Sequence, residues 1–185
     1  RSVRKAFDTV DHEAFLASMR AVGFEENVIR LIMNLQSGFE CQVNTPLGLT
    51  EPFKVEQGCK QGCAVSPLRF IILYDIFLKF LQHSNKGYKW KCMSWEDTLT
   101  IPAGAFMDDM ILIADNAEDF RYMAEMFDKF LRAVGLSLNA KKCHYTSVNT
   151  GDQNPDIWCT DEKGVRQQIL RADGSVPMIY LGYAL

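Results

Sequence analysis

The 185-residue sequence lacks long hydrophobic runs, a secretory leader and an excess of basic residues. A membrane-spanning helix needs roughly 20 apolar residues, whereas the longest apolar stretch, residues 70–81, is interrupted by Tyr74, Asp75 and Lys79. The first five residues are followed by no apolar segment of the kind found in signal peptides. We therefore expect an intracellular protein, in the nucleus or the cytoplasm, with no membrane partner.

Histidine is scarce, with three residues, and the six cysteines are scattered along the chain. Cys59 and Cys63 are four positions apart, but no second pair follows at the spacing of zinc ligands, so we expect no zinc site. Reduced thiols are the simpler interpretation for a chain without a secretory leader. The formal net charge of -3 argues against a dedicated nucleic-acid-coating domain, which would carry a basic excess.

The chain does have the composition of one globular domain, with 48% hydrophobic and 23% charged residues. Helix patterns alternate with strand patterns at first and hairpin patterns recur later, which predicts an α+β fold. The chain begins at Arg1 without an initiator methionine and stops at Leu185 inside an apolar run. We therefore expect a fragment of a longer protein.

Periodicity, caps and turn residues place the individual elements. The predicted helices cover residues 11–23, 25–36, 66–81 and 116–135. The predicted strands cover residues 3–10, 39–43, 49–55, 99–106, 110–114 and 176–185, with a hairpin over 157–171 and a strand beginning near residue 143. In the second helix, Val28, Leu31, Ile32 and Leu35 share one face and are expected to be buried, and residues 88–97 are expected to form a loop.

Two adjacent carboxylates, Asp108 and Asp109, lie between two apolar runs that suit buried strands. A tight hairpin normally uses Asn-Gly or Asp-Gly, because the favoured turns need positive φ. Two neighbouring like charges repel, and Mg²⁺ would relieve that repulsion because it prefers hard oxygen ligands. On these residues alone, an ordinary acidic turn and half of a metal site are both open.

Three further features are equally ambiguous when each is taken alone. Phe7 could be a core aromatic residue, and Gln61-Gly62 could be an ordinary loop. The segment 135–143, with two lysines near its end, could simply connect a helix to a strand.

The order and spacing of these features closely resemble the palm of reverse transcriptases, in particular those of non-LTR retrotransposons and group II introns. The matching segments are residues 2–12 with Lys5-Ala6-Phe7-Asp8 (the tail of motif A), 61–70 with Gln61-Gly62 and Ser66-Pro67-Leu68 (motif B), 106–109 with Phe106-Met107-Asp108-Asp109 (motif C), 135–143 with Gly135-Leu136-Ser137-Leu138-Asn139 and Lys142-Cys143 (motif D), and 180–182 with Tyr180-Leu181-Gly182 (motif E). The resemblance covers residues 1–185 and implies a polymerase palm, in which an antiparallel sheet carries the catalytic hairpin and packs against helices, with part of the fingers and no thumb. Met107 occupies a position where Ala is more usual in the non-LTR group.

The resemblance also implies an activity, RNA-directed DNA synthesis by two-metal nucleotidyl transfer. Its partners would be an RNA template, a DNA primer, deoxynucleoside triphosphates and the missing fingers and thumb of the parent chain. Its cofactor would be two Mg²⁺ ions, with Mn²⁺ as an alternative. A viral RNA-copying palm would fit less well, because such enzymes usually carry Gly-Asp-Asp.

The same resemblance implies roles for individual residues. Asp108 and Asp109 would be catalytic metal ligands, and Lys142 would be a candidate proton donor near the pyrophosphate. Phe7 would exclude a ribose 2′-hydroxyl, whereas Gln61 and Gly62 would border the nucleotide and the template.

One departure from the family concerns Ser2, which stands where motif A has a metal-binding Asp. A neutral hydroxyl cannot supply the charge of a carboxylate. Asp8 falls on the same face of a strand as Ser2 but roughly 20 Å further along, so it cannot substitute. We therefore expect either an inactive copy or an altered first few residues, and a non-catalytic palm relic that binds nucleic acid or protein is the alternative.

Overall fold

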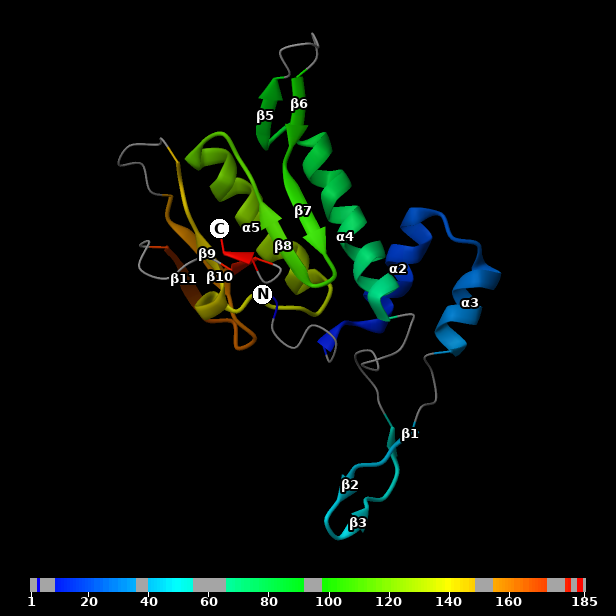
Figure 1. Ribbon diagram of the computed structural model, residues 1–185. Helices are drawn as coiled ribbons and strands as arrows, with labels where there is room; N and C mark the ends of the chain where they lie inside the picture. The colour runs from blue at the N-terminus through cyan, green and yellow to red at the C-terminus, as the bar shows by residue number, and fades with distance from the viewer. Residues whose placement is uncertain are drawn as a thin grey trace.

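The computed structural model describes residues 3, 9–35, 40–54, 66–91, 98–148 and 155–172, and the backbone of 179–180 and 183–184. The chain has a mixed α+β fold, which confirms the predicted class (Figure 1). The helices are α2 (His12–Val22), α3 (Glu26–Asn34), α4 (Ser66–His83), α5 (Ala117–Ala133) and the short 3₁₀ helix η1 (Ala140–Lys142). The strands are β1 (Glu40–Cys41), β2 (Asn44–Thr45), β3 (Gly48–Leu49), β4 (Phe53–Lys54), β5 (Tyr88–Lys91), β6 (Thr98–Ile101), β7 (Ala103–Phe106), β8 (Asp109–Leu112), β9 (His144–Tyr145), β10 (Ile157–Thr160), β11 (Arg166–Arg171), β12 (Ile179–Tyr180) and β13 (Tyr183–Ala184).

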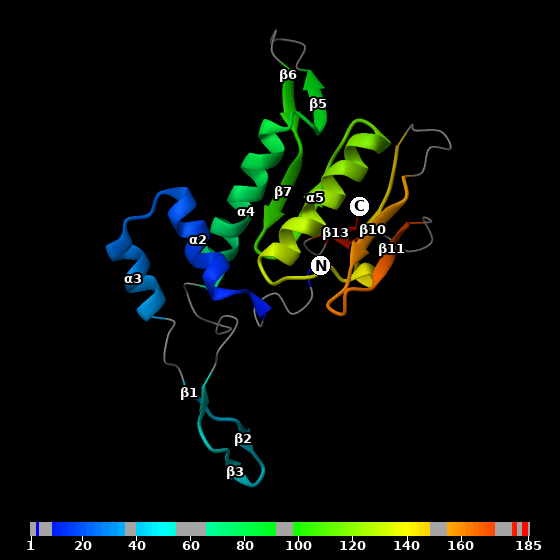
Figure 2. The same ribbon diagram turned by 180° about the vertical axis from the view of Figure 1, so that it is seen from behind.

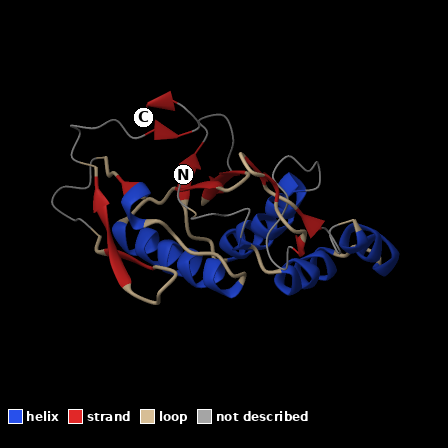
Figure 3. Cartoon of the chain, turned by 90° about the horizontal axis from the view of Figure 1, so that it is seen from below, coloured by secondary structure: helices blue, strands red, loops and turns tan. Residues whose placement is uncertain are grey.

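The centre of the molecule is a β7–β8 hairpin that lies across two long helices. Strand β7 contacts α4, β8 contacts α5, and the two helices contact each other (Figures 1 and 2). Seen from below, the helices line up along one side of the molecule (Figure 3). The main core lies between these elements and is rich in aromatic residues of α4 and α5, among them Tyr74, Phe77 and Phe127. The hairpin therefore rests on a rigid helical support.

Local capping chemistry sets the ends of α2 and α5, as the sequence predicted. The Asp11 carboxylate accepts hydrogen bonds from the backbone N–H groups of Glu13 (2.7 Å) and Ala14 (3.0 Å). Gly23 ends α2 with φ +96°, a left-handed conformation that glycine adopts without steric cost. Asn116 caps α5 by accepting the N–H of Asp119 at 2.8 Å.

The predicted inner face of α3 is correct at Ile32 and wrong at its other three residues. Ile29 and Ile32 are buried, whereas Val28, Leu31 and Leu35 are exposed. The apolar residues of the helix cover one broad arc that includes both Val28 and Ile29, so its periodicity does not fix which part of the arc is buried. Packing against α2 and α4 in a second small core decides between those faces.

The predicted loop over residues 88–97 is also wrong at its start. Residues Tyr88–Lys91 form β5, which pairs antiparallel with β6 in the register Tyr88↔Ile101 to Lys91↔Thr98. Every residue of β5 is exposed, so no alternation of buried and exposed residues marks it as a strand. The predicted strand 99–106 is divided into β6 and β7 at Pro102, which has no N–H to donate to a partner strand.

The predicted hairpin over residues 157–171 is confirmed, whereas the region of the predicted strands 39–43 and 49–55 forms four short strands. Strands β1 to β4 form a projecting hairpin whose tip has the pair Thr45↔Gly48 on either side of residues 46–47 (Figure 1). Strands β10 and β11 pair antiparallel around residues 161–165. The buried Asp128 of α5 holds this second hairpin, because its carboxylate accepts the backbone N–H of Thr160 at 2.8 Å.

The ends of the chain are described in part. Val3 forms one antiparallel bridge with Leu138, but Thr9 is helical, so the predicted strand over 3–10 does not continue to its end. The predicted strand near residue 143 is β9, which follows η1 and pairs parallel with β11. At the other end, β12 and β13 pair antiparallel. Among the described cysteines, Cys41, Cys143 and Cys159, there is no disulfide.

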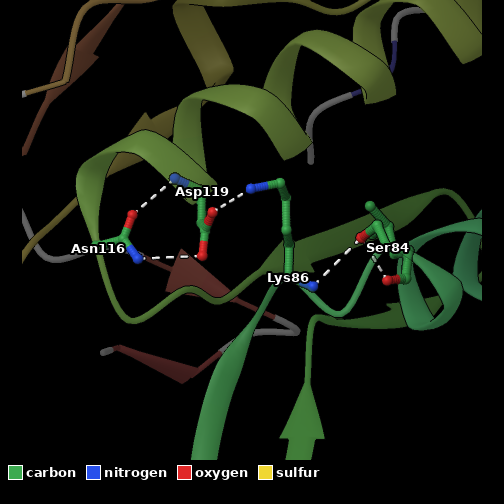
Figure 4. Close-up of polar contacts among 5 residues, drawn as sticks. Ser84, Lys86, Asn116 and Asp119 are labelled. Atoms are coloured by element: carbon green, nitrogen blue, oxygen red, sulfur yellow. Dashed lines mark hydrogen bonds and ion pairs between the residues drawn. The ribbon is translucent and has the colours of Figure 1, made fainter.

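A polar cluster ties the segment after α4 to the start of α5 (Figure 4). The Lys86 ammonium forms an ion pair with the Asp119 carboxylate, which also accepts a hydrogen bond from the Asn116 side chain at 3.1 Å. The backbone N–H of Lys86 lies 3.4 Å from the Ser84 hydroxyl. The lysine side chain also lies over the ring of Tyr122, 5.1 Å from its centroid. These contacts fix the base of the β5–β6 ribbon against α5.

None of the described helices is both long enough and apolar enough to cross a membrane.

Candidate active site

The β7–β8 hairpin places the two adjacent carboxylates at the tip of the central strands. The register pairs Ala103 with Leu112 at one end and Phe106 with Asp109 at the other. Met107 and Asp108 are therefore the two turn residues, and Asp109 is the first residue of β8. Our interpretation of Asp108-Asp109 as the connection itself is wrong by one position, since the pairing register sets the turn.

The turn is strained at Met107, which has φ +52°. A positive φ brings the Cβ of an L-residue too close to backbone atoms and costs roughly 1–2 kcal/mol. Met107 has positive φ and Asp108 does not, which is the pattern of a type II′ turn, where glycine is the usual first residue. A non-glycine residue persists in such a conformation only where its surroundings enforce it.

The nearest support for this turn comes from α4. The Tyr74 hydroxyl donates a hydrogen bond to the backbone carbonyl oxygen of Asp108, with the two oxygens 3.3 Å apart. Tyr74 is 1% exposed. Its ring makes edge-on contacts with Phe70, at 6.2 Å between centroids, and with Phe127 of α5, at 6.0 Å.

The Tyr74 hydroxyl is buried and lies close enough to the acidic pair to be influenced by its negative charges. Burial raises the pKa of this phenol well above its usual range, and the negative charges of Asp108 and then Asp109 raise the pKa further. Tyr74 therefore remains protonated at neutral pH and acts as a hydrogen-bond donor.

Asp108 and Asp109 are suitable ligands for a hard divalent cation but do not form a complete ligand set by themselves. Both are half-buried at the surface of the tip. No lysine or arginine in the described part of the chain forms an ion pair with the Asp108 carboxylate. Carboxylate oxygens are the ligands that Mg²⁺ prefers. The described residues contain no group of three or more potential metal ligands, so the hairpin offers two carboxylates and the described ranges add no third.

Of the other predicted site residues, the structure describes Lys142. Lys142 is exposed at the end of η1, which packs against β11. Over the described ranges, neither a hydrogen bond nor an ion pair joins Lys142 to Asp108 or Asp109. The predictions for Ser2, Phe7, Gln61 and Gly62 lie outside the described residues.

Two features of the site were missed in the sequence: the contact of Tyr74 and the strain at Met107. The sequence does carry a signal for the buried face of α4, since Phe70, Tyr74 and Phe77 fall at helical spacing. It gives no sign that the hydroxyl reaches a carbonyl 34 residues away.

Comparison with known proteins matches residues 2–185 to the family described as reverse transcriptase (RNA-dependent DNA polymerase). The chain belongs to the reverse transcriptase family. This match confirms the predicted family and agrees with a palm-like α+β fold, and it favours a reverse transcriptase over a viral RNA-copying palm.

Curated relatives point to retrotransposons. The chain is 30% identical over 148 residues to a retrovirus-related Pol polyprotein from the type-1 retrotransposable element R2 of Popillia japonica, covering 80% of this chain and 24% of the relative. It is 31% identical over 146 residues to the type-2 R2DM polyprotein of Drosophila melanogaster, covering 79% and 13%. It is 27% identical over 138 residues to the transposon TX1 uncharacterized 149 kDa protein of Xenopus laevis, covering 75% and 10%. The aligned part thus spans about a quarter or less of the length of these relatives.

Proposed function

We propose that the chain is the palm part, residues 1–185, of an RNA-directed DNA polymerase from a retroelement. The observation that carries this proposal is the β7–β8 hairpin, which presents Asp108 and Asp109 side by side at its tip in a chain of the reverse transcriptase family. The expected partners are an RNA template, a DNA primer, deoxynucleoside triphosphates and the fingers and thumb of the parent chain. We place the reaction inside the cell, in the nucleus or the cytoplasm.

In this proposal Asp108 and Asp109 hold divalent metal, Mg²⁺ or Mn²⁺, through their carboxylate oxygens. When bound, two such ions activate a hydroxyl nucleophile and stabilise the charge on a leaving phosphate. Both carboxylates are half-buried, with the Oδ1 atom of Asp109 buried, and the strand register places them at the tip of the hairpin. Phe7, Gln61 and Gly62 would contact the incoming nucleotide and template, and Lys142 would donate a proton to the pyrophosphate.

The identity of residue 2 limits what this chain does by itself. A two-metal site of this family uses a third carboxylate from motif A, and the chain has Ser2 at that position. A hydroxyl supplies neither the charge nor the bridging oxygens of a carboxylate. We therefore propose that this chain binds metal through Asp108 and Asp109 but does not extend a primer.

The alternative function is a palm relic that serves as a scaffold for nucleic acid or protein without holding metal. Ser2 is the observation in its favour, because a chain released from catalysis no longer needs the motif A carboxylate.

A calorimetric Mg²⁺ titration separates the two functions. The leading proposal predicts binding that disappears in Asp108→Asn and persists in Asp75→Asn, which removes a half-buried carboxylate of α4 that pairs with Lys79. The scaffold predicts no Mg²⁺ binding that depends on Asp108.

A primer-extension assay on an RNA template tests the proposed inactivity. We expect no extension by the 185-residue chain with either Mg²⁺ or Mn²⁺. Extension by this chain would overturn the assignment of Ser2 as a lost ligand.

A further inference from the structure

The β7–β8 turn is contacted by a side chain from outside the hairpin. Its first residue, Met107, has φ +52°, and the hydrogen bond recorded from another element to the turn backbone comes from the Tyr74 hydroxyl of α4. We propose that Tyr74 is a positioning residue that holds the Met107-Asp108 turn in the conformation that presents both carboxylates. This inference rests on the proposed function of Asp108 and Asp109.

The point of contact explains how one hydroxyl can orient two side chains. The carbonyl oxygen of Asp108 belongs to the peptide unit that joins Asp108 to Asp109. That unit is planar, so a fixed orientation restrains ψ of Asp108 and φ of Asp109, two of the torsions that direct their side chains. A donor held at this oxygen therefore restrains the backbone of both acidic residues.

The donor itself has little freedom to move. Tyr74 is 1% exposed, and its ring is held edge-on by Phe70 on the same helix and Phe127 on α5. The ring of Phe130 lies 6.4 Å away on a further side. Helix α4 also contacts β7 directly. The packing of α4 against α5 thus fixes the position of the phenol, and the phenol restrains the tip of the hairpin.

The chemistry of the donor also suits this role. A protonated phenol donates one hydrogen bond to a carbonyl but offers no positive charge to the neighbouring carboxylates, whereas a lysine or an arginine at this position would pair with them. The Tyr74 hydroxyl therefore holds the backbone between Asp108 and Asp109 without forming an ion pair with either carboxylate.

The test compares the full chain with Tyr74→Phe, which removes the hydroxyl and keeps the ring. The matched control is Tyr145→Phe, since Tyr145 is also buried and packs against the ring of Phe120, but lies on β9. The readouts are backbone NMR of residues 106–110: amide exchange, and the intraresidue HN–Hα NOE of Met107, which is strong when φ is positive.

We expect amide exchange in the turn to become about fivefold faster in Tyr74→Phe, the effect of losing one neutral hydrogen bond. We also expect the NOE of Met107 to weaken while amides in the interior of α4 and α5 are unchanged. The control should leave the turn unaltered. An unaltered turn in Tyr74→Phe would refute the proposal, and so would a loss of protection spread evenly over the helices, which indicates a packing role alone.

Two further measurements keep the outcome decisive. Should Tyr74→Phe fail to fold, the wild-type chain still decides, because the proposal requires a slowly exchanging Tyr74 hydroxyl proton with NOEs to the backbone of 107–109. Mg²⁺ titration of the same samples separates this inference from the proposed function. Loss of binding in Asp108→Asn tests the metal site, whereas the state of the turn in Tyr74→Phe is measured without metal.

Discussion

Because the hairpin tip is strained at position 107, we predict that glycine stabilises the protein more than alanine there, the reverse of the usual order. At most positions glycine is less stabilising than alanine by about 0.5–1 kcal/mol, because glycine loses more backbone freedom on folding. Met107 has φ +52°, a conformation that costs an L-residue about 1–2 kcal/mol and costs glycine nothing. Glycine should therefore exceed alanine at this position.

The magnitude follows from these two opposing effects. Met107→Gly and Met107→Ala remove nearly the same side chain, which is 39% exposed, so the loss of burial is shared and cancels in the comparison. Subtracting the glycine penalty from the relief of strain leaves glycine ahead by about 0.5–1 kcal/mol. The same pair of substitutions at Leu170, an exposed position in β11 with ordinary φ, should show alanine ahead instead.

Equilibrium unfolding in urea measures the free energy of unfolding of the glycine and alanine variants at both positions. The values are compared using one common m-value, the slope of that free energy against urea concentration. The expected result is a reversal of sign between positions 107 and 170. If alanine is equal or superior to glycine at position 107, the turn is not left-handed there, and the argument that Tyr74 restrains a strained turn loses its basis.

Three more predictions concern other parts of the fold. Gly87→Ala should lower the free energy of unfolding by more than about 2 kcal/mol in urea, because Gly87 has φ +144° and an added Cβ would lie 2.7 Å from the backbone Cα of Pro102; an unchanged midpoint would contradict that approach. The hydrogen bond from Lys86 lowers the pKa of the Asp119 carboxyl, so its contribution is complete above about pH 4 and is lost as the pH falls through the lowered folded value. Acid unfolding followed by circular dichroism should therefore be steeper in wild type than in Lys86→Met, and equal slopes would argue against the ion pair. Burial raises the pKa of the Cys143 thiol to about 12, so iodoacetamide at pH 8 should alkylate it only after unfolding, and rapid native labelling would contradict its position in the core.

Elements set by local chemistry could be predicted from the sequence. Asp11 and Asn116 cap their helices through their own side chains, and Gly23 ends α2 because its conformation is a property of the residue. The hairpin around residues 161–165 likewise follows from turn residues next to one another in the chain. Asp108 and Asp109 are adjacent in the sequence, so these two candidate ligands could be predicted without the structure.

Features that depend on distant packing could not be predicted. The inner face of α3 was misplaced because its apolar residues cover a broad arc, and packing against α2 and α4 decides which part of that arc is buried. Strand β5 has no buried face, so its pairing with β6 leaves no alternation to recognise. The strain at Met107 follows from the strand register, and the bond from Tyr74 joins residues 34 positions apart.

The most direct test of the proposed metal site is the Mg²⁺ affinity of Ser2→Asp relative to wild type, measured by calorimetry on the full chain. In the proposed function, Asp108 and Asp109 are two carboxylates of a polymerase site whose third position is residue 2. We predict that the added carboxylate tightens Mg²⁺ binding and that Asp108→Asn in the same background abolishes the gain. An affinity that is unchanged in Ser2→Asp, or a gain that survives Asp108→Asn, would contradict the assignment of these residues to one metal site.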